Sequence, residues 1–197
     1  AYQPILIIGH GVRLSGAEKE IVKLIDKFNI PAVFTWNSCD LLSANHKLYV
    51  GKPGNVAARS ANFAIQSASH IISIGARLDN ITTAYDIKRF GRSAIAKWLI
   101  DIDKNQLHSC DMEGSIKLNI DALEFCKYLN KKDSLPERVD WVEHCSWLKH
   151  KYSACDGNIP TNKEFLTHFE ASQLISNAIP EGSTIITGSS GLAIEAF

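Results

Sequence analysis

The chain has 197 residues, of which 45% are hydrophobic and 21% are charged, so it can form a packed core and does not have the composition of a disordered tail. Its 21 basic and 21 acidic residues give a net charge of zero. This balance disfavours a dedicated nucleic-acid binder, because contacts to a phosphate backbone need a basic surplus. No apolar run approaches the roughly 18 residues of a membrane span, and the start, Ala1-Tyr-Gln-Pro4, lacks the basic segment of a signal peptide.

The cysteines favour a reducing compartment. There are five of them, an odd number, and none forms a C-x-x-C pair, so a disulfide framework is disfavoured. His144, Cys145, His150 and Cys155 lie close together in the sequence, but their spacing matches no standard zinc pattern. We therefore expect a cytoplasmic protein without a metal site of its own, a membrane segment or a nucleic-acid partner.

Short apolar runs alternate with amphipathic stretches over the first 130 residues. The apolar runs are rich in Ile and Val and predict strands, the first of them buried on both faces, at 4–9, 30–35, 70–75, 97–103 and 116–119. The amphipathic stretches predict helices over 21–28, 55–68 and 121–129. Ser15 and Glu18 fit a capping box before the first helix, and Asn55 could cap the second.

This alternation predicts the fold class. Short connections between strands and helices imply right-handed crossovers and a mainly parallel sheet. We expect a three-layer, doubly wound α/β domain with five or six strands over residues 1–130. Ligands of such sheets bind at the carboxyl ends of the strands, beside the switch in strand order.

The pattern changes after residue 130. Residues 131–136 are typical of a linker, and the next stretches predict helices over 137–154 and 170–178, a strand over 182–188, and a further turn and helix over 189–197. A strand so near the end, without a crossover partner, suggests that the chain is cut inside a second α/β domain. We expect three parts, which are a central domain at 1–130, an interdomain linker with a helix at 131–165, and the start of the second domain at 166–197.

Glycines follow the first predicted strand. At Gly9 and Gly11 the backbone could approach a phosphate, with the next helix offering its N-terminus to the anion. A plain tight turn explains these glycines equally well. The spacing is not G-x-G-x-x-G, and the second strand ends in Thr35-Trp-Asn37 without the acidic residue that holds a ribose in dinucleotide folds. Both departures disfavour a nicotinamide dehydrogenase.

Three later segments carry candidate ligand groups. Lys52 lies in a Gly/Pro loop and could face an anion, although an ordinary loop is an equal alternative. Arg77 follows the third strand and suits a phosphate or an adenine face, unless it forms a structural pair with Asp79. Asp101 lies at the end of the fourth strand and could accept hydrogen bonds from ribose or adenine, whereas Asp103 is typical of a helix N-cap. The sequence has no Walker loop, nucleophile elbow or evident acid–base pair, which indicates binding and not catalysis.

Four motifs in this order resemble the central domain of thiamine-diphosphate-dependent enzymes, and most closely that of acetolactate synthase large subunits and related 2-oxo-acid carboligases and decarboxylases. They are Gly9-His-Gly-Val-Arg13, Val50-Gly-Lys-Pro-Gly54, Gly75-Ala-Arg-Leu-Asp79 and Ile100-Asp-Ile-Asp103. Residues 184–197 resemble the opening strand and helix of that family's diphosphate-binding domain. The resemblance implies that the activating glutamate and the Mg²⁺ motif lie in regions outside this chain, so the chain should have no catalytic residue and should not be catalytic alone.

The resemblance also implies which residues hold a cofactor. In the family this domain carries FAD without a redox role, carries ADP, or is empty, and these alternatives stay open. By motif, the resemblance places Gly9, His10 and Gly11 along the phosphates of an adenine nucleotide, and Thr35 and Trp36 along the flavin or ribityl side. It places Lys52, Pro53 and Gly54 in a loop over the cofactor. Gly75, Ala76, Arg77 and Asp79 are expected at ribose, adenine and diphosphate, and Asp101 and Ile102 at the adenosine end. The turn expected at the thiamine diphosphate tail comprises Gly188, Ser189, Ser190 and Gly191.

The sequence departs from the family pattern at two of these places. Gly51-Lys-Pro-Gly54 stands where the family has Gly-Met-His-Gly, and Arg77-Leu-Asp-Asn-Ile81 stands where it has Arg-Phe-Asp-Asp-Arg. The second arginine of the family motif is therefore missing.

The leading hypothesis is a piece of a thiamine-diphosphate and Mg²⁺-dependent enzyme, which decarboxylates a 2-oxo acid such as pyruvate and adds the two-carbon unit to an acceptor. Such an enzyme is expected to be a homo-oligomer. The alternative is a nucleotide-binding or structural module that braces its neighbours and helps subunits dimerise.

Overall fold

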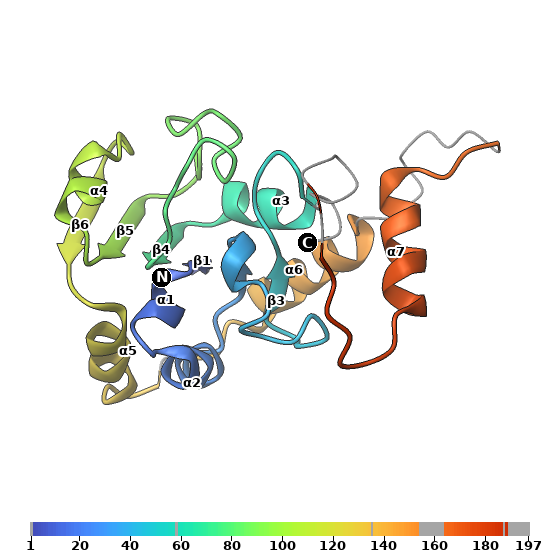
Figure 1. The fold of residues 1–197 in the computed structure, drawn as a ribbon. Helices are drawn as coiled ribbons and strands as arrows, with labels where there is room; N and C mark the ends of the chain where they lie inside the picture. Colours follow the sequence, from blue (N-terminus) through green and yellow to red (C-terminus); the bar gives the residue numbers. More distant parts are fainter. Residues whose placement is uncertain (1, 58, 135, 154–163, 187, 189–197) are drawn as a thin grey trace.

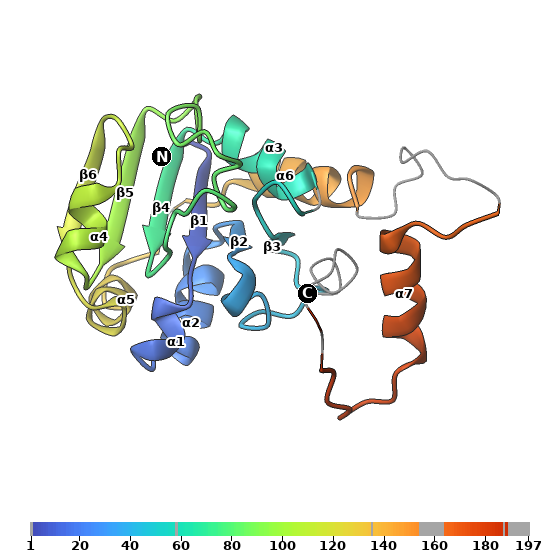
Figure 2. The same cartoon turned by 45° about the horizontal axis from the view of Figure 1, so that its top comes forward.

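The computed structural model describes residues 2–57, 59–134, 136–153, 164–186 and 188. Within them the chain forms a sheet of six strands, all parallel, in the order β3-β2-β1-β4-β5-β6 (Figures 1 and 2). The strands are β1 (Pro4–Ile8), β2 (Ala32–Phe34), β3 (Tyr49–Gly51), β4 (His70–Ile74), β5 (Ala96–Asp101) and β6 (Ser115–Asn119). The prediction of a parallel sheet with five or six strands is confirmed.

Helices cover both faces of the sheet. The helices in the described part of the chain are α1 (Gly11–Leu14), α2 (Glu18–Phe28), a 3₁₀ helix η1 (Trp36–Ser38), α3 (Arg59–Ser67), α4 (Lys104–Ser109), α5 (Ala122–Asn130), α6 (Val139–Lys151) and α7 (His168–Ala178). The apolar residues of α2 and α5 pack on one face of the sheet, and those of α3 and α6 pack on the other (Figure 2). The fold is therefore a three-layer α/β arrangement, as expected.

Strand β1 shows why the layers form. Its side chains alternate between the two cores, with Ile5 and Ile7 facing the α3 and α6 layer and Leu6 and Ile8 facing the α2 and α5 layer. All four are at most 1% exposed. A strand buried on both faces must be apolar at every position, which is the pattern that the sequence shows.

The strand order reverses direction beside β1. The chain runs from β1 outward to β2 and β3, and then returns to form β4 on the other side of β1. Ile8 of β1 and Ile74 of β4 pair in register, so the two strands end side by side. The carboxyl ends of β1 and β4 thus mark the switch point at which ligands of such sheets bind.

Two predicted helix starts are wrong. Ser15 does not begin a capping box, because it ends α1, where its Oγ donates to the Val12 carbonyl oxygen, and α2 follows Ala17 without a side-chain cap. Asn55 does not cap α3, which begins at Arg59. The sequence analysis also did not predict β3 or α1, which have three and four residues, and for α4, which has six, it gave only the N-cap, Asp103. Elements of this length are too short to show a hydrophobic period.

Helix α6 belongs to the core of the first part of the chain. Trp141, Cys145 and Leu148 are at most 4% exposed and join the cluster beneath α3. The indole Nε1 of Trp141 donates to the carbonyl oxygen of Pro4, at a distance of 2.7 Å. The predicted linker at 131–165 therefore contains a helix that packs on the sheet, while the three-part division of the chain stays a prediction.

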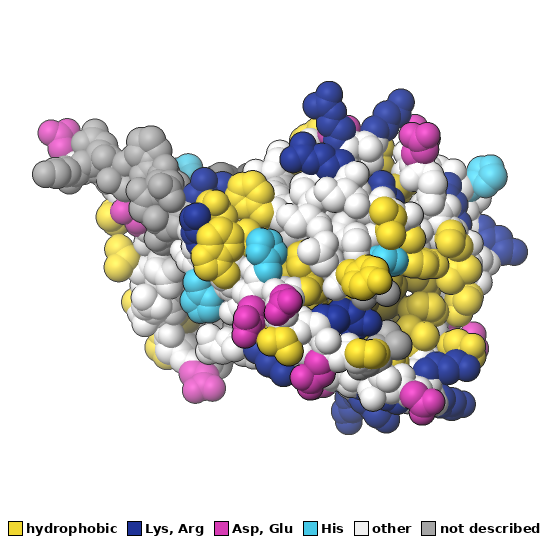
Figure 3. Space-filling view, turned by 180° about the vertical axis from the view of Figure 1, so that it is seen from behind, with side chains coloured by type: hydrophobic (Ala, Val, Ile, Leu, Met, Phe, Trp, Pro, Cys, Tyr) yellow, Lys and Arg dark blue, Asp and Glu magenta, His cyan; other side chains and the backbone are white. Residues whose placement is uncertain are grey.

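The outer side of α6 is partly apolar. Trp147 is 49% exposed, and the Lys151 Nζ lies 4.5 Å from the centroid of its ring. Figure 3 shows hydrophobic side chains beside Lys, Arg and His side chains on this rear face. Among the described residues, no helix is long and apolar enough to cross a membrane.

Helix α7 stands apart from the sheet (Figure 1). It begins at a capping box formed by Thr167 and Glu170, and none of its residues is buried. The strand predicted at 182–188 is not formed in the described part of that range. Ile186 is 93% exposed there, and none of the six strands in the described part of the chain pairs with this segment, so this prediction is wrong.

Candidate functional site

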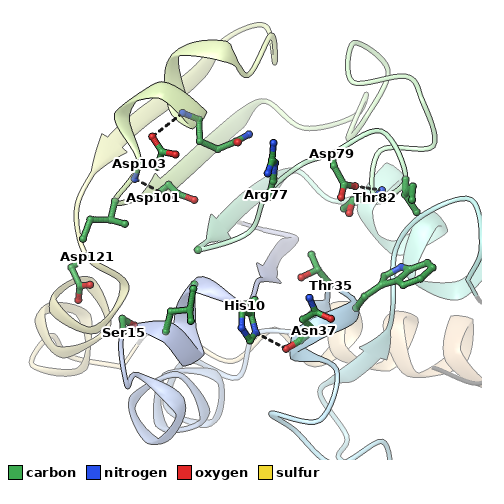
Figure 4. A pocket seen from close by; sticks show the side chains of 17 residues that line it. His10, Ser15, Thr35, Asn37, Arg77, Asp79, Thr82, Asp101, Asp103 and Asp121 are labelled. Atoms are coloured by element: carbon green, nitrogen blue, oxygen red, sulfur yellow. Dashed lines mark hydrogen bonds between the residues drawn. The ribbon is translucent and has the colours of Figure 1, made fainter. Parts of the chain in front are cut away.

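A pocket of about 710 Å³ opens at the carboxyl edge of the sheet (Figure 4). Its lining comes from the segments that follow β1, β2, β4, β5 and β6. The predicted site residues that line it are His10, Gly11, Thr35, Trp36, Gly75, Arg77, Asp79, Asp101 and Ile102. These residues are up to 92 positions apart in the sequence, as His10 and Ile102 are. They come together because the parallel strands all end at one edge of the sheet.

Backbone hydrogen bonds tie the strand ends to one another. The bonds run from the Thr35 N–H to the Ile8 carbonyl oxygen (2.9 Å), from the Gly9 N–H to that of Ile74 (3.0 Å), and from the Gly75 N–H to that of Ile100 (2.9 Å). Each bond links a strand end to the end of its neighbour. The loops that carry the pocket residues thus start from fixed positions.

Glycine is required where the β1 and β4 ends meet. A Cβ on Gly9 would lie 2.2 Å from the Cα of Ala76 and 2.2 Å from the carbonyl oxygen of Gly75, and Gly75 has a φ of +56°. The Gly11 N–H donates to the Gly75 carbonyl oxygen at 2.9 Å. The amides of Gly9 and Gly11 are therefore bonded to the β4 segment, and a contact between these glycines and a phosphate stays a prediction.

His10 lies between the ends of β1 and β2. Its Nδ1 is 2.9 Å from the carbonyl oxygen of Asn37. Because a carbonyl oxygen can only accept, Nδ1 carries the proton and donates. The ring is thus fixed by one nitrogen, and Nε2 remains for another partner.

Arg77 is exposed and lies between Asp79 on one side and Asp101 on the other (Figure 4). The Asp79 Oδ1 accepts a hydrogen bond from the Thr82 N–H at 2.7 Å, which closes the loop after β4. In the part of the chain that the structure describes, Arg77 forms no ion pair, so the suggested pair with Asp79 is not formed. The guanidinium donors of Arg77 are available to an anionic ligand.

Three carboxylates lie at or just past the ends of β5 and β6. The Asp101 Oδ1 accepts from the Asp103 N–H at 2.9 Å. Asp103 caps α4, as predicted, and Asp121 caps α5. Each of these bonds uses the Oδ1 oxygen of its carboxylate. The carboxylates therefore fix their own loops while they line the pocket.

Some predicted residues lie outside the lining. Gly9 and Ala76 pack against each other beneath it. Lys52, Pro53 and Gly54 form a loop beside it, and burial lowers the pKa of Lys52. The Asn62 side chain holds this loop through both the N–H (2.9 Å) and the carbonyl oxygen (2.6 Å) of Gly54.

The geometry of this pocket does not test the residues expected at the thiamine diphosphate tail, which lie near the C-terminal end of the chain. Gly188 is exposed, and a Cβ built on it meets no atom within 4 Å. Ser189, Ser190 and Gly191 lie outside the described residues.

The sequence analysis did not assign eight further lining residues to the site, which are Leu14, Ser15, Asn37, Ile81, Thr82, Asp103, Gln106 and Asp121. A signal existed for two of them, because Asp103 ends a predicted strand and Asp121 begins a predicted helix, where an acidic residue is typical of an N-cap. Thr82 is buried in a loop that folds back toward Gly54, and no local pattern indicates such a return.

The pocket has the size and the polar groups of a small-molecule site. Its volume lies within the range of small-molecule pockets, roughly 300–1,000 Å³. Arg77 offers donors for a phosphate, the carboxylates offer acceptors for hydroxyl or amino groups, and Trp36 and Ile81 offer apolar surface. In the described parts of the chain, no three His, Cys, Asp or Glu side chains are grouped as a metal ion would need.

Comparison with known proteins identifies the family to which most of the chain is similar. Residues 1–129 match the family described as thiamine pyrophosphate enzyme, central domain. The chain is 33% identical over 166 residues to a probable acetolactate synthase large subunit of Methanococcus aeolicus, a match that covers 81% of this chain and 27% of that protein. It is 26% identical over 158 residues to the acetolactate synthase isozyme 2 large subunit of Escherichia coli, a match that covers 78% of this chain and 27% of that protein.

A second kind of relative is similar over nearly the whole chain. The 3D-(3,5/4)-trihydroxycyclohexane-1,2-dione hydrolase of Clostridium botulinum (strain Eklund 17B / Type B) is 25% identical over 198 residues, which covers 98% of this chain and 30% of that protein. The chain thus spans less than a third of the length of these relatives.

Proposed function

The chain belongs to the family of thiamine pyrophosphate enzyme central domains, and from this premise we propose that it is the central domain of an acetolactate synthase-like enzyme whose pocket binds FAD or another adenine nucleotide. The whole enzyme would decarboxylate a 2-oxo acid and transfer the two-carbon unit to an acceptor. Mg²⁺ and most of thiamine diphosphate would be held by regions of the enzyme beyond this chain, which spans 27% of its acetolactate synthase relatives. The enzyme would act as a homo-oligomer.

The observation that carries the nucleotide proposal is the placement of Arg77. It lies at the centre of the carboxyl edge, without an ion-pair partner among the described residues, and between carboxylates that come from different strands. A guanidinium binds phosphate oxygens in a bidentate manner, and carboxylates accept from hydroxyl groups. Arg77 would hold the diphosphate, Asp101 would accept from the ribose or adenine, and Trp36 would lie against the second half of a dinucleotide.

The bound nucleotide would stabilise this domain and supply no reacting atom. The pocket lining contains no nucleophile paired with a base, so the chain's own residues bind and orient the ligand. The isolated chain should therefore show ligand binding without decarboxylase activity.

Thermal or urea unfolding of the 197-residue chain with FAD, ADP or NAD tests this proposal. A ligand at about 100 times its Kd should add about 2.7 kcal/mol to the free energy of unfolding. Arg77→Gln should lose most of this gain with FAD or ADP, because Arg77 is the only arginine among the described residues that line the pocket. Arg92→Gln, which removes an exposed arginine outside the pocket, should keep it. No stabilisation by any adenine compound would leave only a structural role for the domain.

Hydrolysis of a cyclic 1,2-dione is the second candidate for the whole enzyme. The observation that favours it is the coverage of 98% of this chain by the Clostridium hydrolase, against 81% for the Methanococcus synthase. Assays of the full-length enzyme with pyruvate and with the cyclic dione separate the two reactions. Product from pyruvate alone supports the synthase, and ring opening alone supports the hydrolase.

A further inference from the structure

The outer side of helix α6 carries a stripe of four exposed side chains. Asp140, His144, Trp147 and Lys151 are spaced four, three and four residues apart, so they lie along one side of the helix. None of them packs in the core. Trp147 is 49% exposed, although tryptophan buries more apolar surface than most side chains when it is covered. Because tryptophan is enriched at the centre of protein interfaces, this stripe is a candidate contact surface.

The aromatic rings of the stripe form a continuous surface. The ring of His144 stacks at 5.6 Å from that of Trp141 and at 5.8 Å from that of Trp147. Tyr152, which directly follows α6, meets the Trp147 ring edge-on at 6.1 Å, and its other contact is Phe63 of α3 at 4.7 Å. These contacts hold the rings in place, so a partner that covers them loses less affinity to the ordering of side chains.

The two ends of the stripe carry opposite charge. Asp140 and Glu143 lie in the amino-terminal half of α6, whereas Lys151 ends the helix, with His150 beside it. Figure 3 shows hydrophobic and His side chains on this rear face, flanked by basic side chains on one side and by acidic side chains on the other. The surface therefore has an acidic end, an aromatic centre and a basic end.

Such a surface is complementary to a copy of itself turned by 180°. Two α6 helices that pack antiparallel, about a two-fold axis midway between His144 and Trp147, place His144 of each copy against Trp147 of the other. Asp140 and Lys151 each lie four residues outside this pair, so they meet across the same axis. A two-fold contact thus joins opposite charges at both of its ends, whereas a parallel arrangement would place like charges together.

We propose that this face of α6, continued by Tyr152 and Phe63, is a contact surface between two copies of the chain, with the two α6 helices antiparallel. It lies away from the nucleotide pocket, to which α6 contributes no residue, and it gives the proposed homo-oligomer a contact surface. The 13 residues of α6 span about 20 Å, so the interface is small. We therefore expect a dissociation constant of about 1–100 μM.

Sedimentation velocity of the 197-residue chain, at concentrations from about 1 to 300 μM, tests the contact. The mass should rise from 21.8 kDa toward twice that value as the concentration increases. Trp147→Ala should weaken the association about tenfold or more, while its circular dichroism spectrum stays unchanged because Trp147 lies outside the core. A chain that stays monomeric over the whole range would overturn the proposal, and this face would then be open to solvent or to another part of the whole enzyme.

An exchange of charges tests the antiparallel arrangement. Asp140→Lys and Lys151→Asp should each weaken the association about tenfold, because the two-fold axis makes each substitution place like charges together at two contacts. The variant that combines both substitutions restores opposite charges and should associate nearly as tightly as the wild type. Asp111→Lys, which reverses an exposed charge outside this face, is the matched control and should leave the association unchanged.

The combined variant also separates association from stability. Asp140 lies in the first turn of α6 and Lys151 in the last, where their charges favour the helix dipole. A loss of fold stability would therefore be largest in the combined variant, in which association should return. Association that is weakest in the combined variant, or that neither single substitution weakens, would overturn the antiparallel contact. Nucleotide binding by the same chains tests the proposed function separately, since failure of either one leaves the other standing.

Discussion

At the scale of single residues, the groups that surround the pocket also hold its loops. Asp79 accepts from the Thr82 N–H, Asp101 accepts from the Asp103 N–H, and His10 donates to Asn37. A ligand would therefore meet side chains that are already fixed, which reduces the entropy that binding has to overcome. Substitutions at these positions should be isosteric, as Asp to Asn is, if the loop is to be kept.

Two buried thiols make the stability of the fold depend on pH. Burial raises the pKa of Cys145 to about 12, and burial together with Glu20 and Asp121 raises that of Cys126 to about 12. An unfolded cysteine ionises near pH 8.5. Their contribution is therefore complete below about pH 8.5 and is lost as the pH rises toward 12, because only the unfolded state releases the protons.

Urea unfolding between pH 8.5 and 10.5, in the presence of a reductant, measures this dependence. The free energy of unfolding should fall as the pH rises, by up to about 1.4 kcal/mol per pH unit for each fully buried thiol. Cys145→Ala should be less stable at pH 8 but should lose less stability on going to pH 10.5. Cys110→Ala removes a half-buried cysteine and provides the comparison. The same slope in the wild type and in Cys145→Ala would contradict the argument.

At the scale of elements, Asp121 couples the end of β6 to the start of α5. Its Oδ1 accepts from the Leu123 N–H at 2.8 Å and from the Glu124 N–H at 3.2 Å. Asp121→Ala should lower the free energy of unfolding by about 1 kcal/mol, as loss of an N-cap does, whereas Asp121→Asn should lower it by much less because Asn also caps helices. Urea unfolding at neutral pH measures both, and equal losses in the two variants would show that the cap is not the cause.

The longer elements could be predicted from their sequence, and the short ones could not. Strand β1 and helices α2 and α5 have a clear apolar pattern, because each buries residues against a core on one or both of its sides. The segment Tyr49–Gly51 is only three residues long and ends in a glycine, so nothing local distinguishes it from a loop. It becomes a strand because Ala32 and Val33 of β2 pair with it.

The same limit applies to the pocket. Residues at or just past the end of a strand, such as Asp101 and Arg77, could be assigned to the site because parallel strands all end at one edge. Ile81 and Thr82 could not, because they reach the pocket through a loop that folds back onto Gly54. That return depends on contacts between residues distant in the sequence, which no local pattern contains.

At the scale of the whole molecule, α6 and α7 differ in what they contribute. Helix α6 buries Trp141, Cys145 and Leu148 in the core under α3, whereas α7 has no buried residue. The stable unit of this chain should therefore extend through α6 and should not require α7.

Two truncated chains test this boundary. A chain that ends after Lys132 exposes the apolar surface that α6 covers, and it should lose several kcal/mol of stability, since truncation of one large core side chain alone costs about 2–5 kcal/mol. A chain that ends after Ser153 keeps α6 and should unfold at nearly the temperature of the 197-residue chain. Differential scanning calorimetry measures both, and similar melting of the two truncated chains would contradict the role assigned to α6.

The connection between α5 and α6 has a mechanical consequence. Helix α5 packs against α2 on one face of the sheet, α6 packs against α3 on the other, and the Trp141 indole is bonded to Pro4, the first residue of β1. The connection therefore passes around the amino edge of the sheet. At the other end of α6, Tyr152 packs against Phe63 and Arg59 of α3, so tension applied to the chain beyond Tyr152 is borne first by the contact between α6 and α3.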